Sequence, residues 1–189
     1  MGQINFMQTN YSSDITLAVD CLKAGQVIAY PTEAVFGLGC EPLNEAAVLE
    51  LLRIKQRPIE KGLILIASSL EQIEPYLLLT DELLEKVLPT WAGAVTWVIP
   101  AKPSVPRWLK GEHESLAVRV TAHPIAKALC EQYGGAIVST SANITTQPAF
   151  RDAKEVADAF PELFVLEGAL GNLAQETAIY DAVTGQKLR

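Results

Sequence analysis

The chain has 189 residues, of which 49% are hydrophobic and 20% are charged, and its net charge is −7. This length and apolar content are enough to bury a core, which excludes intrinsic disorder and predicts a single domain over residues 1–189. The negative net charge disfavours generic binding to nucleic acid or to an anionic membrane.

Predicted helices and strands alternate along the chain. The helices begin at capping or helix-opening residues, namely Ser13, Asn44, Ser69, Thr80, Pro124 and Asp152. The strands are apolar runs bounded by turn residues, at 27–30, 63–67, 94–99, 116–120, 136–139, 163–166 and 177–180. This interleaving predicts an α/β or α+β domain in which helices pack on one sheet. The long connections between strands argue against a simple doubly wound order.

The sequence contains no signal for a membrane or an oxidising compartment. The longest apolar runs, such as residues 63–67, are far shorter than the ~18 residues that a membrane helix needs. The first basic residue is Lys23, so a cationic signal peptide is not indicated. Three widely spaced cysteines predict reduced thiols rather than disulfides or a zinc site. We therefore expect a cytoplasmic protein.

Motifs of several common enzyme classes are missing as well. The chain has no GxxxxGK[ST] phosphate loop and no GxSxG elbow, and Gly37-Leu38-Gly39 lacks the third glycine of a dinucleotide fingerprint. The two histidines, His113 and His123, show no metal-ligand spacing and stand beside no nucleophile. A nucleotide would have to be bound in another way, and a Ser/His hydrolase or a zinc enzyme is not indicated.

Positive charge is concentrated in two short segments. Residues 53–61 and residues 102–110 each carry a net charge of +3 although the whole chain is acidic. Lys55 and Arg57 end the helix that begins at Asn44, where cations complement the helix dipole or hold a polyphosphate. This pattern indicates an anion-binding surface, with an ordinary solvated charge run as the alternative.

Polar residues follow several predicted strands, where a rigid sheet can aim them into a crevice. Thr32 and Glu33 follow the first strand and precede Gly37 and Gly39, which we interpret as flexible positions. Three hydroxyls and an amide lie within residues 139–143 and suit phosphate or carboxylate recognition. A plain turn is the alternative in both places.

Arg119 lies inside an otherwise apolar strand, between Val118 and Val120. A guanidinium that is buried in a sheet needs an anionic partner. The partner is either a bound substrate anion or a carboxylate of the chain in a structural salt bridge.

These residues occur in the order typical of the YrdC family, which the chain resembles from about Ser13 to its last residue. The resemblance is carried by Tyr30-Pro31-Thr32-Glu33, Lys55-Gln56-Arg57-Pro58, Lys61-Gly62-Leu63, Val118-Arg119-Val120 with His123-Pro124, and Ser141-Ala142-Asn143. The Lys-x-Arg and Ser-x-Asn pairs together make the match specific. It implies a twisted mixed sheet with helices packed on it and a basic concave surface.

The resemblance also implies an activity. Members of the family make threonylcarbamoyl-AMP and pyrophosphate from L-threonine, bicarbonate and ATP. This nucleotidyl transfer is the first step toward threonylcarbamoyladenosine in tRNA, and a separate transferase complex would modify the tRNA. Mg²⁺ would be held mainly through the ATP phosphates and water, with no metal ligand from the chain.

The site residues follow from the family motifs. ATP would be bound by Lys55, Arg57, Ser141 and Asn143, with Ser115 and Thr145 as further nucleotide contacts. Threonine would be surrounded by Thr32, Arg119, Ser139 and Thr177. Lys55 and Arg57 are the expected catalytic residues, because cations stabilise the charge that grows on the phosphates. Both are expected to be exposed at the helix end.

The chain departs from the family pattern at two places near this site. Thr146 replaces the glycine that follows the Ser-Ala-Asn loop, which predicts a stiffer or differently aimed loop. Glu176-Thr177 replaces Pro-Ser, which keeps a hydroxyl and adds a negative charge.

Two other functions fit the same basic concavity. A non-catalytic module would hold tRNA or double-stranded RNA through shape and phosphate contacts, but an arginine inside a strand and a net charge of −7 count against it. A small-ligand sensor would bind ATP and threonine without releasing pyrophosphate.

Overall fold

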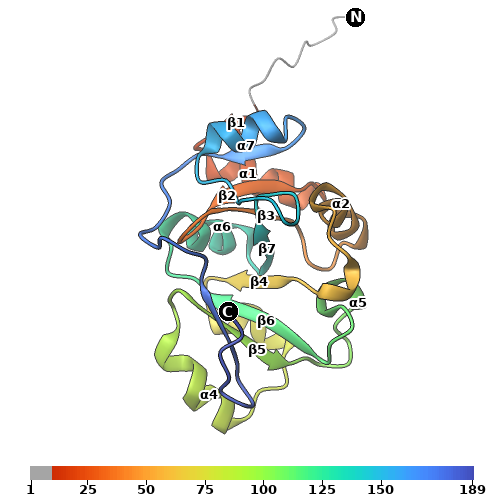
Figure 1. Cartoon of the computed structure of the whole chain (residues 1–189), viewed down its shortest axis with the longest axis vertical. Coiled ribbons are helices and arrows are strands. Elements are labelled where there is room, and N and C mark those ends of the chain that lie inside the picture. The colour runs from red at the N-terminus through yellow and green to blue at the C-terminus, as the bar shows by residue number, and fades with distance from the viewer. Residues whose placement is uncertain (1–9) are drawn as a thin grey trace, which may run out of the picture.

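The computed structural model describes residues 10–189, which form a nine-stranded mixed sheet (Figure 1). From one edge to the other, the strands are β1 (Tyr11–Ser12), β8 (Phe164–Leu166), β2 (Ile28–Pro31), β3 (Phe36–Gly39), β7 (Ile137–Ser141), β4 (Ile64–Ala67), β6 (Ser115–Val120), β5 (Val95–Pro100) and β9 (Ala178–Asp181). Pairs β1–β8, β2–β8, β4–β6 and β5–β9 are parallel, and the other four are antiparallel. The predicted mixed sheet is confirmed.

Helices cover both faces of this sheet. They are α1 (Ile15–Lys23), α2 (Glu45–Lys55), α3 (Leu70–Ile73), α4 (Asp81–Val87), α5 (Arg107–Lys110), α6 (Pro124–Tyr133) and α7 (Ala153–Ala159), with single 3-10 turns at η1 (Ile59–Lys61), η2 (Glu74–Tyr76) and η3 (Leu88–Thr90). No helix of residues 10–189 is long and apolar enough to cross a membrane. The three cysteines are free thiols; Cys40 and Cys130 are buried and Cys21 is partly exposed.

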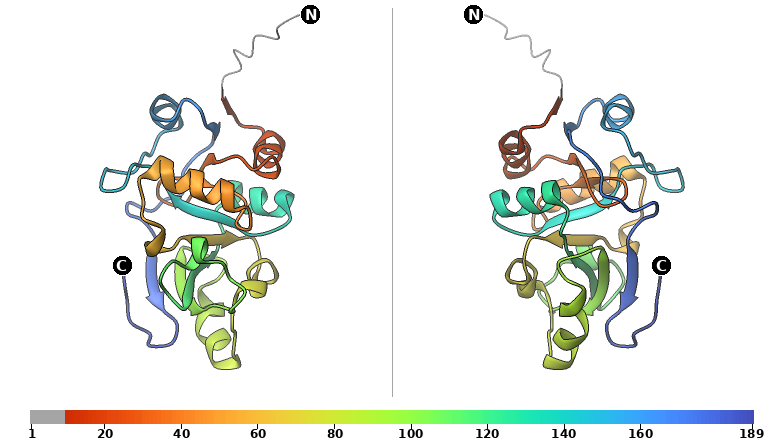
Figure 2. Two further views of the ribbon diagram at one scale, coloured as in Figure 1. Left: turned by 90° about the vertical axis from the view of Figure 1, so that its right-hand side faces the viewer. Right: turned by 90° about the vertical axis from the view of Figure 1, so that its left-hand side faces the viewer.

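Side chains alternate between two cores along the central strands. Leu65, Val118 and Val138 belong to the larger core, which also takes the apolar faces of α2, α4, α5 and α7. Ile66 and Ile137, which project from the other face, pack beneath α1 and α6. These two helices lie against each other (Figure 2). The polar strand residues gather on the part of that second face that α1 and α6 do not cover.

The predicted strands agree with the observed ones to within two residues at each end. The first helix is capped by Asp14 instead of Ser13, because the Asp14 carboxylate accepts the N–H of Thr16 at 2.9 Å. The expected caps at Asn44 and Thr80 are confirmed by hydrogen bonds to backbone N–H groups in the first turns of α2 and α4.

The interpretation of Gly37 and Gly39 as flexible positions is wrong, because both lie in strand β3. A Cβ atom on Gly39 would come within 2.7 Å of the ring of Tyr30, which is fully buried. The Tyr30 hydroxyl donates to the Val138 carbonyl at 3.1 Å, so its ring lies directly across β3. Glycine is needed here for close packing, and β3 joins β2 to β7 in the sheet.

Candidate active site

A cavity of about 610 Å³ opens over the sheet, between the end of α2, strands β4, β6 and β7, and the chain around β9. It is lined by all ten of the expected site residues: Thr32, Lys55, Arg57, Ser115, Arg119, Ser139, Ser141, Asn143, Thr145 and Thr177. Six cationic side chains face it: Lys55, Arg57, Lys61, Lys110, Arg119 and Arg189. The expected basic concave surface is therefore present, and its volume is typical of a ligand site.

The two positively charged segments contribute unequally to the cavity. Three of the four cations of the first segment line it, but Arg53 lies outside and pairs with Glu50 on the exposed side of α2. In the second segment only Lys110 provides a lining cation, because Arg107 pairs with carboxylates outside the cavity. Both segments thus contribute cations to the concave surface, while Arg53, Lys102 and Arg107 do not line it.

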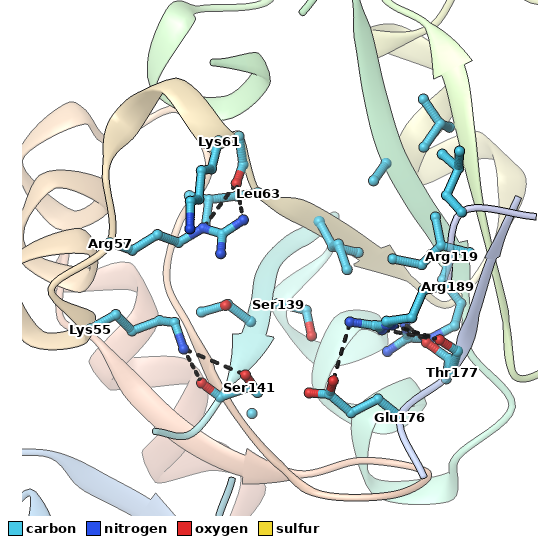
Figure 3. A pocket seen from close by; sticks show the side chains of 18 of the residues that line it. Lys55, Arg57, Lys61, Leu63, Arg119, Ser139, Ser141, Glu176, Thr177 and Arg189 are labelled. Atoms are coloured by element: carbon cyan, nitrogen blue, oxygen red, sulfur yellow. Dashed lines mark hydrogen bonds and ion pairs between the residues drawn. The ribbon is translucent and has the colours of Figure 1, made fainter. Parts of the chain in front are cut away.

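The end of α2 aims two cations into the cavity. Helix α2 ends at Lys55, and Gln56 takes a left-handed conformation with φ 51° that reverses the chain. Because of this reversal, Lys55 and Arg57 both face the same opening (Figure 3). The residue between Lys55 and Arg57 in the Lys-x-Arg motif is therefore the helix cap that lets both cations face the cavity.

Lys55 is buried, with 2% of its surface exposed, so the expectation that it is exposed is wrong. Its ammonium group donates to the Ser141 carbonyl at 2.6 Å, to the Asn143 side-chain oxygen at 2.6 Å and to the Asn143 carbonyl at 3.1 Å. The N–H of Thr145 returns a bond to the Lys55 carbonyl at 2.8 Å. The loop after β7 therefore covers the helix end. Burial and the Arg57 charge lower the pKa of Lys55 to about 8.

Arg57 is held more loosely than Lys55. Its Nε and Nη2 atoms donate to the Gly62 carbonyl at 3.2 and 3.0 Å, and its side chain is half-buried. Burial and the nearby charge of Arg189 lower the pKa of Arg57. A guanidinium with one internal acceptor and a neighbouring cation is well prepared to receive an anion.

Arg119 lies at the other side of the cavity, and 4% of it is exposed. Its Nη1 atom donates to the hydroxyls of Thr96 at 2.9 Å and Thr177 at 3.1 Å. Its Nε atom lies 3.4 Å from a carboxylate oxygen of Glu33. The chain itself therefore supplies an anionic partner, which the sequence left open as one alternative. Thr177 lies within this cluster although the residue before it departs from the family pattern.

The remaining expected residues have separate surroundings. The Thr32 hydroxyl donates to the Val35 carbonyl at 2.6 Å, which closes the turn after β2. Ser139 is buried in β7, and Ser115 is half-buried at the start of β6. The Thr145 hydroxyl oxygen is buried and has no hydrogen-bond partner among residues 10–189.

Sequence patterns did not indicate Arg189, a charged residue of the cavity wall. Arg189 donates to the Thr177 carbonyl at 3.0 and 3.2 Å, and its Nη1 atom lies 3.2 Å from the Glu176 carboxylate (Figure 3). Arg189 reaches this place because the chain after β9 folds back, with the Leu188 N–H donating to the Ile179 carbonyl at 2.7 Å. Such a return cannot be deduced from local sequence.

The loop that covers Lys55 contains a strained residue. Thr146 has φ 76°, a left-handed conformation that is rare for a β-branched residue and costs about 1–3 kcal/mol. This explains in physical terms why glycine suits the position.

Replacing Thr146 by glycine is expected to raise the free energy of unfolding by about 1 kcal/mol, after the entropic cost of glycine is subtracted. Urea unfolding of both proteins measures the difference. The neighbouring Gln147→Gly exchange, at a position without positive φ, should instead be destabilising. If the Thr146→Gly protein is less stable than the parent, the claim that Thr146 is strained is contradicted.

Comparisons with known proteins identify the family of the chain. The chain belongs to the Sua5/YciO/YrdC family, whose model is described as "Telomere recombination" and matches residues 20–189. The threonylcarbamoyl-AMP synthase of Klebsiella pneumoniae is 52% identical over 188 residues, which cover 97% of this chain and 99% of that protein. The threonylcarbamoyl-AMP synthase of Coxiella burnetii is 48% identical over 186 residues, with coverages of 95% and 98%. The family resemblance is thus confirmed.

Solved structures show the same fold. The crystal structure of P. abyssi Sua5 complexed with L-threonine superposes with a TM-score of 0.84 at 32% identity and covers 92% of this chain. This chain matches 52% of that longer protein. E. coli YciO superposes with a TM-score of 0.78 at 27% identity, covering 90% of this chain and 88% of YciO.

Proposed function

We propose that this protein makes threonylcarbamoyl-AMP and pyrophosphate from L-threonine, bicarbonate and ATP. One observation carries the proposal: a single cavity holds a cation-and-hydroxyl cluster around Lys55 and Ser141, and a second cluster around Arg119 and Thr177 (Figure 3). The first cluster suits a polyphosphate and the second suits an amino acid. Two threonylcarbamoyl-AMP synthases about half identical to the chain support this assignment.

The phosphates of ATP bind at the end of α2 in this proposal. Lys55, Arg57, Ser141 and Asn143 hold them, and Ser115 and Thr145 contact the rest of the nucleotide. Arg189 adds a further cation beside Arg57. Mg²⁺ would be held mainly through the ATP phosphates and water; among residues 10–189 no three His, Cys, Asp or Glu side chains gather as a metal site.

Threonine binds at the Arg119 end. Its carboxylate meets the guanidinium, and the hydroxyls of Thr32, Ser139 and Thr177 surround the rest. The threonine amine and bicarbonate give a carbamate and water. A carbamate oxygen then attacks the α-phosphorus while the bond to the bridging oxygen of the β-phosphate breaks, and pyrophosphate leaves with that electron pair. Lys55 and Arg57 stabilise the charge that develops on the phosphates.

The product would serve a separate transferase complex that modifies tRNA in the cell. The competing function, a non-catalytic module for tRNA or double-stranded RNA, has less support. The cations that face the cavity line a recess, and Arg53 and Arg107, on the outer surface, are paired with carboxylates. An RNA backbone is best held by unpaired surface cations.

Carbon-13 bicarbonate tests the proposal. Purified protein is incubated with ATP, Mg²⁺, L-threonine and labelled bicarbonate, and the adenylate is trapped cold for mass spectrometry. We expect threonylcarbamoyl-AMP with one heavy carbon. A threonyl-AMP without the label would indicate simple amino-acid activation, and the absence of any adenylate would indicate a sensor or a binding module.

The lowered pKa of Lys55 makes catalysis sensitive to alkaline pH. The phosphates need the charged ammonium group, whose pKa in the free protein is about 8. Because the charge is lost as the pH rises through this value, kcat/KM for ATP should fall about tenfold per pH unit above it. Lys55→Arg, which keeps its charge, should show no such decline relative to its own value at neutral pH. A flat profile for the parent protein up to pH ~10 contradicts the role of Lys55 as a charged ligand.

A further inference from the structure

Glu33 and Arg119 form a buried ion pair that differs from all other ion pairs of residues 10–189. The side chain of Glu33 is 10% exposed and that of Arg119 is 5% exposed. The side chains in every other ion pair of the described chain are at least 38% exposed. Burying two charges is costly, and the cost is recovered only when the geometry is excellent and the remaining polar atoms are satisfied.

The geometry of this pair is not excellent. Glu33 Oε1 lies 3.4 Å from Arg119 Nε, and that Nε has no hydrogen-bond partner among the described residues. Glu33 Oε2 is also buried without a partner. Stability therefore does not explain why the pair is present. Groups kept in such a state are commonly there for a function.

A hydrogen-bond chain fixes the carboxylate. The Thr121 hydroxyl donates to Glu33 Oε1 at 2.7 Å, and the His123 N–H donates to the Thr121 hydroxyl at 3.1 Å. His123 itself caps α6 and contacts the Ala169 carbonyl at 2.9 Å. The carboxylate is thus tied to the start of a helix that packs on the sheet.

These contacts leave the Nη2 group of the guanidinium without a partner among the described residues. The Nε atom of Arg119 faces Glu33, and Nη1 is engaged by Thr96 and Thr177. Nη2 makes no hydrogen bond within residues 10–189, and Arg119 lines the cavity. Glu33 itself does not line it.

We propose that Glu33 is a positioning residue for the amino-acid substrate: it holds the Nε edge of Arg119 so that Nη2 is presented to the substrate carboxylate. The inference rests on the proposed function. Glu33 acts through Arg119 alone, and it has no part in binding ATP at the other side of the cavity.

Isothermal titration of the Glu33→Gln protein with L-threonine and, separately, with Mg·ATP tests this. Glutamine keeps the acceptor for Thr121 but loses the charge. We expect the dissociation constant for threonine to rise about tenfold, because the charge contact that holds Arg119 is lost, and the constant for ATP to change less than twofold. Glu50→Gln, which breaks an exposed ion pair on α2, is the matched control and should leave both constants unchanged.

Thermal unfolding separates positioning from a purely structural role. A structural role alone would lower the melting temperature and leave the threonine constant of the folded protein unchanged, and this result overturns the proposal. If Glu33→Gln does not fold, Thr121→Val decides, because it releases the carboxylate without removing its charge. The Thr121→Val exchange should raise the dissociation constant for threonine about threefold and leave that for ATP unchanged. An unchanged dissociation constant for threonine again overturns the proposal. A parent protein that binds no threonine refutes the proposed function itself.

Discussion

Replacing Arg57 by alanine is expected to lower the rate of pyrophosphate release by about 10²–10³-fold, the usual loss when one group that stabilises transition-state charge is removed. The fold should survive, because Arg57 is half-buried and its side-chain hydrogen bonds within the described chain go only to the Gly62 carbonyl. Steady-state kinetics together with thermal unfolding check both parts. Arg53→Ala, at a cation that does not line the cavity and pairs with Glu50, is the matched control and should retain full activity.

The corresponding Lys55→Ala exchange should differ from Arg57→Ala in stability. It removes three hydrogen bonds of the buried ammonium group, and among the described residues the Asn143 carbonyl then has no donor. This should cost about 2 kcal/mol of unfolding free energy in addition to the loss of turnover. Near-normal turnover in either the Lys55→Ala or the Arg57→Ala protein would contradict the assigned phosphate site.

Replacing Arg119 by lysine is expected to weaken threonine binding by roughly 10- to 100-fold while ATP binding stays nearly unchanged. A lysine cannot contact Thr96, Thr177 and Glu33 and still present a further N–H group to a carboxylate. Titration calorimetry with each ligand measures the two affinities. If both affinities fall together, Arg119 serves the structure as a whole; if neither falls, its only anionic partner is Glu33.

Much of the fold followed from local patterns in the sequence. Caps at Asn44 and Thr80 and apolar runs bounded by turns placed most elements correctly, because these signals act within a few residues. Strand β3 was missed since its two glycines weaken every strand signal. Glycine is needed at these positions because the Tyr30 ring packs against them from the neighbouring strand, a contact that exists only in the folded sheet.

The candidate site was predictable where family motifs carry it and not elsewhere. The ten expected residues line one cavity, yet the burial of Lys55 was not foreseen, because it depends on a loop 86 to 88 residues further along the chain. Arg189 enters through a chain reversal, and the Glu33 partner of Arg119 comes from a strand end far away in sequence. Sequence periodicity and spacing do not predict which charged residues, far apart in the sequence, come together in the fold.

The dependence of pyrophosphate release on two co-substrates tests the proposed reaction most directly. The protein is supplied with ATP and Mg²⁺, and L-threonine and bicarbonate are added singly and together after dissolved carbon dioxide has been removed. We expect pyrophosphate only when both are present, because the attacking oxygen belongs to a carbamate that forms from the amine and bicarbonate. Release with threonine alone would contradict the carbamate mechanism, and no release under any combination would contradict the enzyme itself.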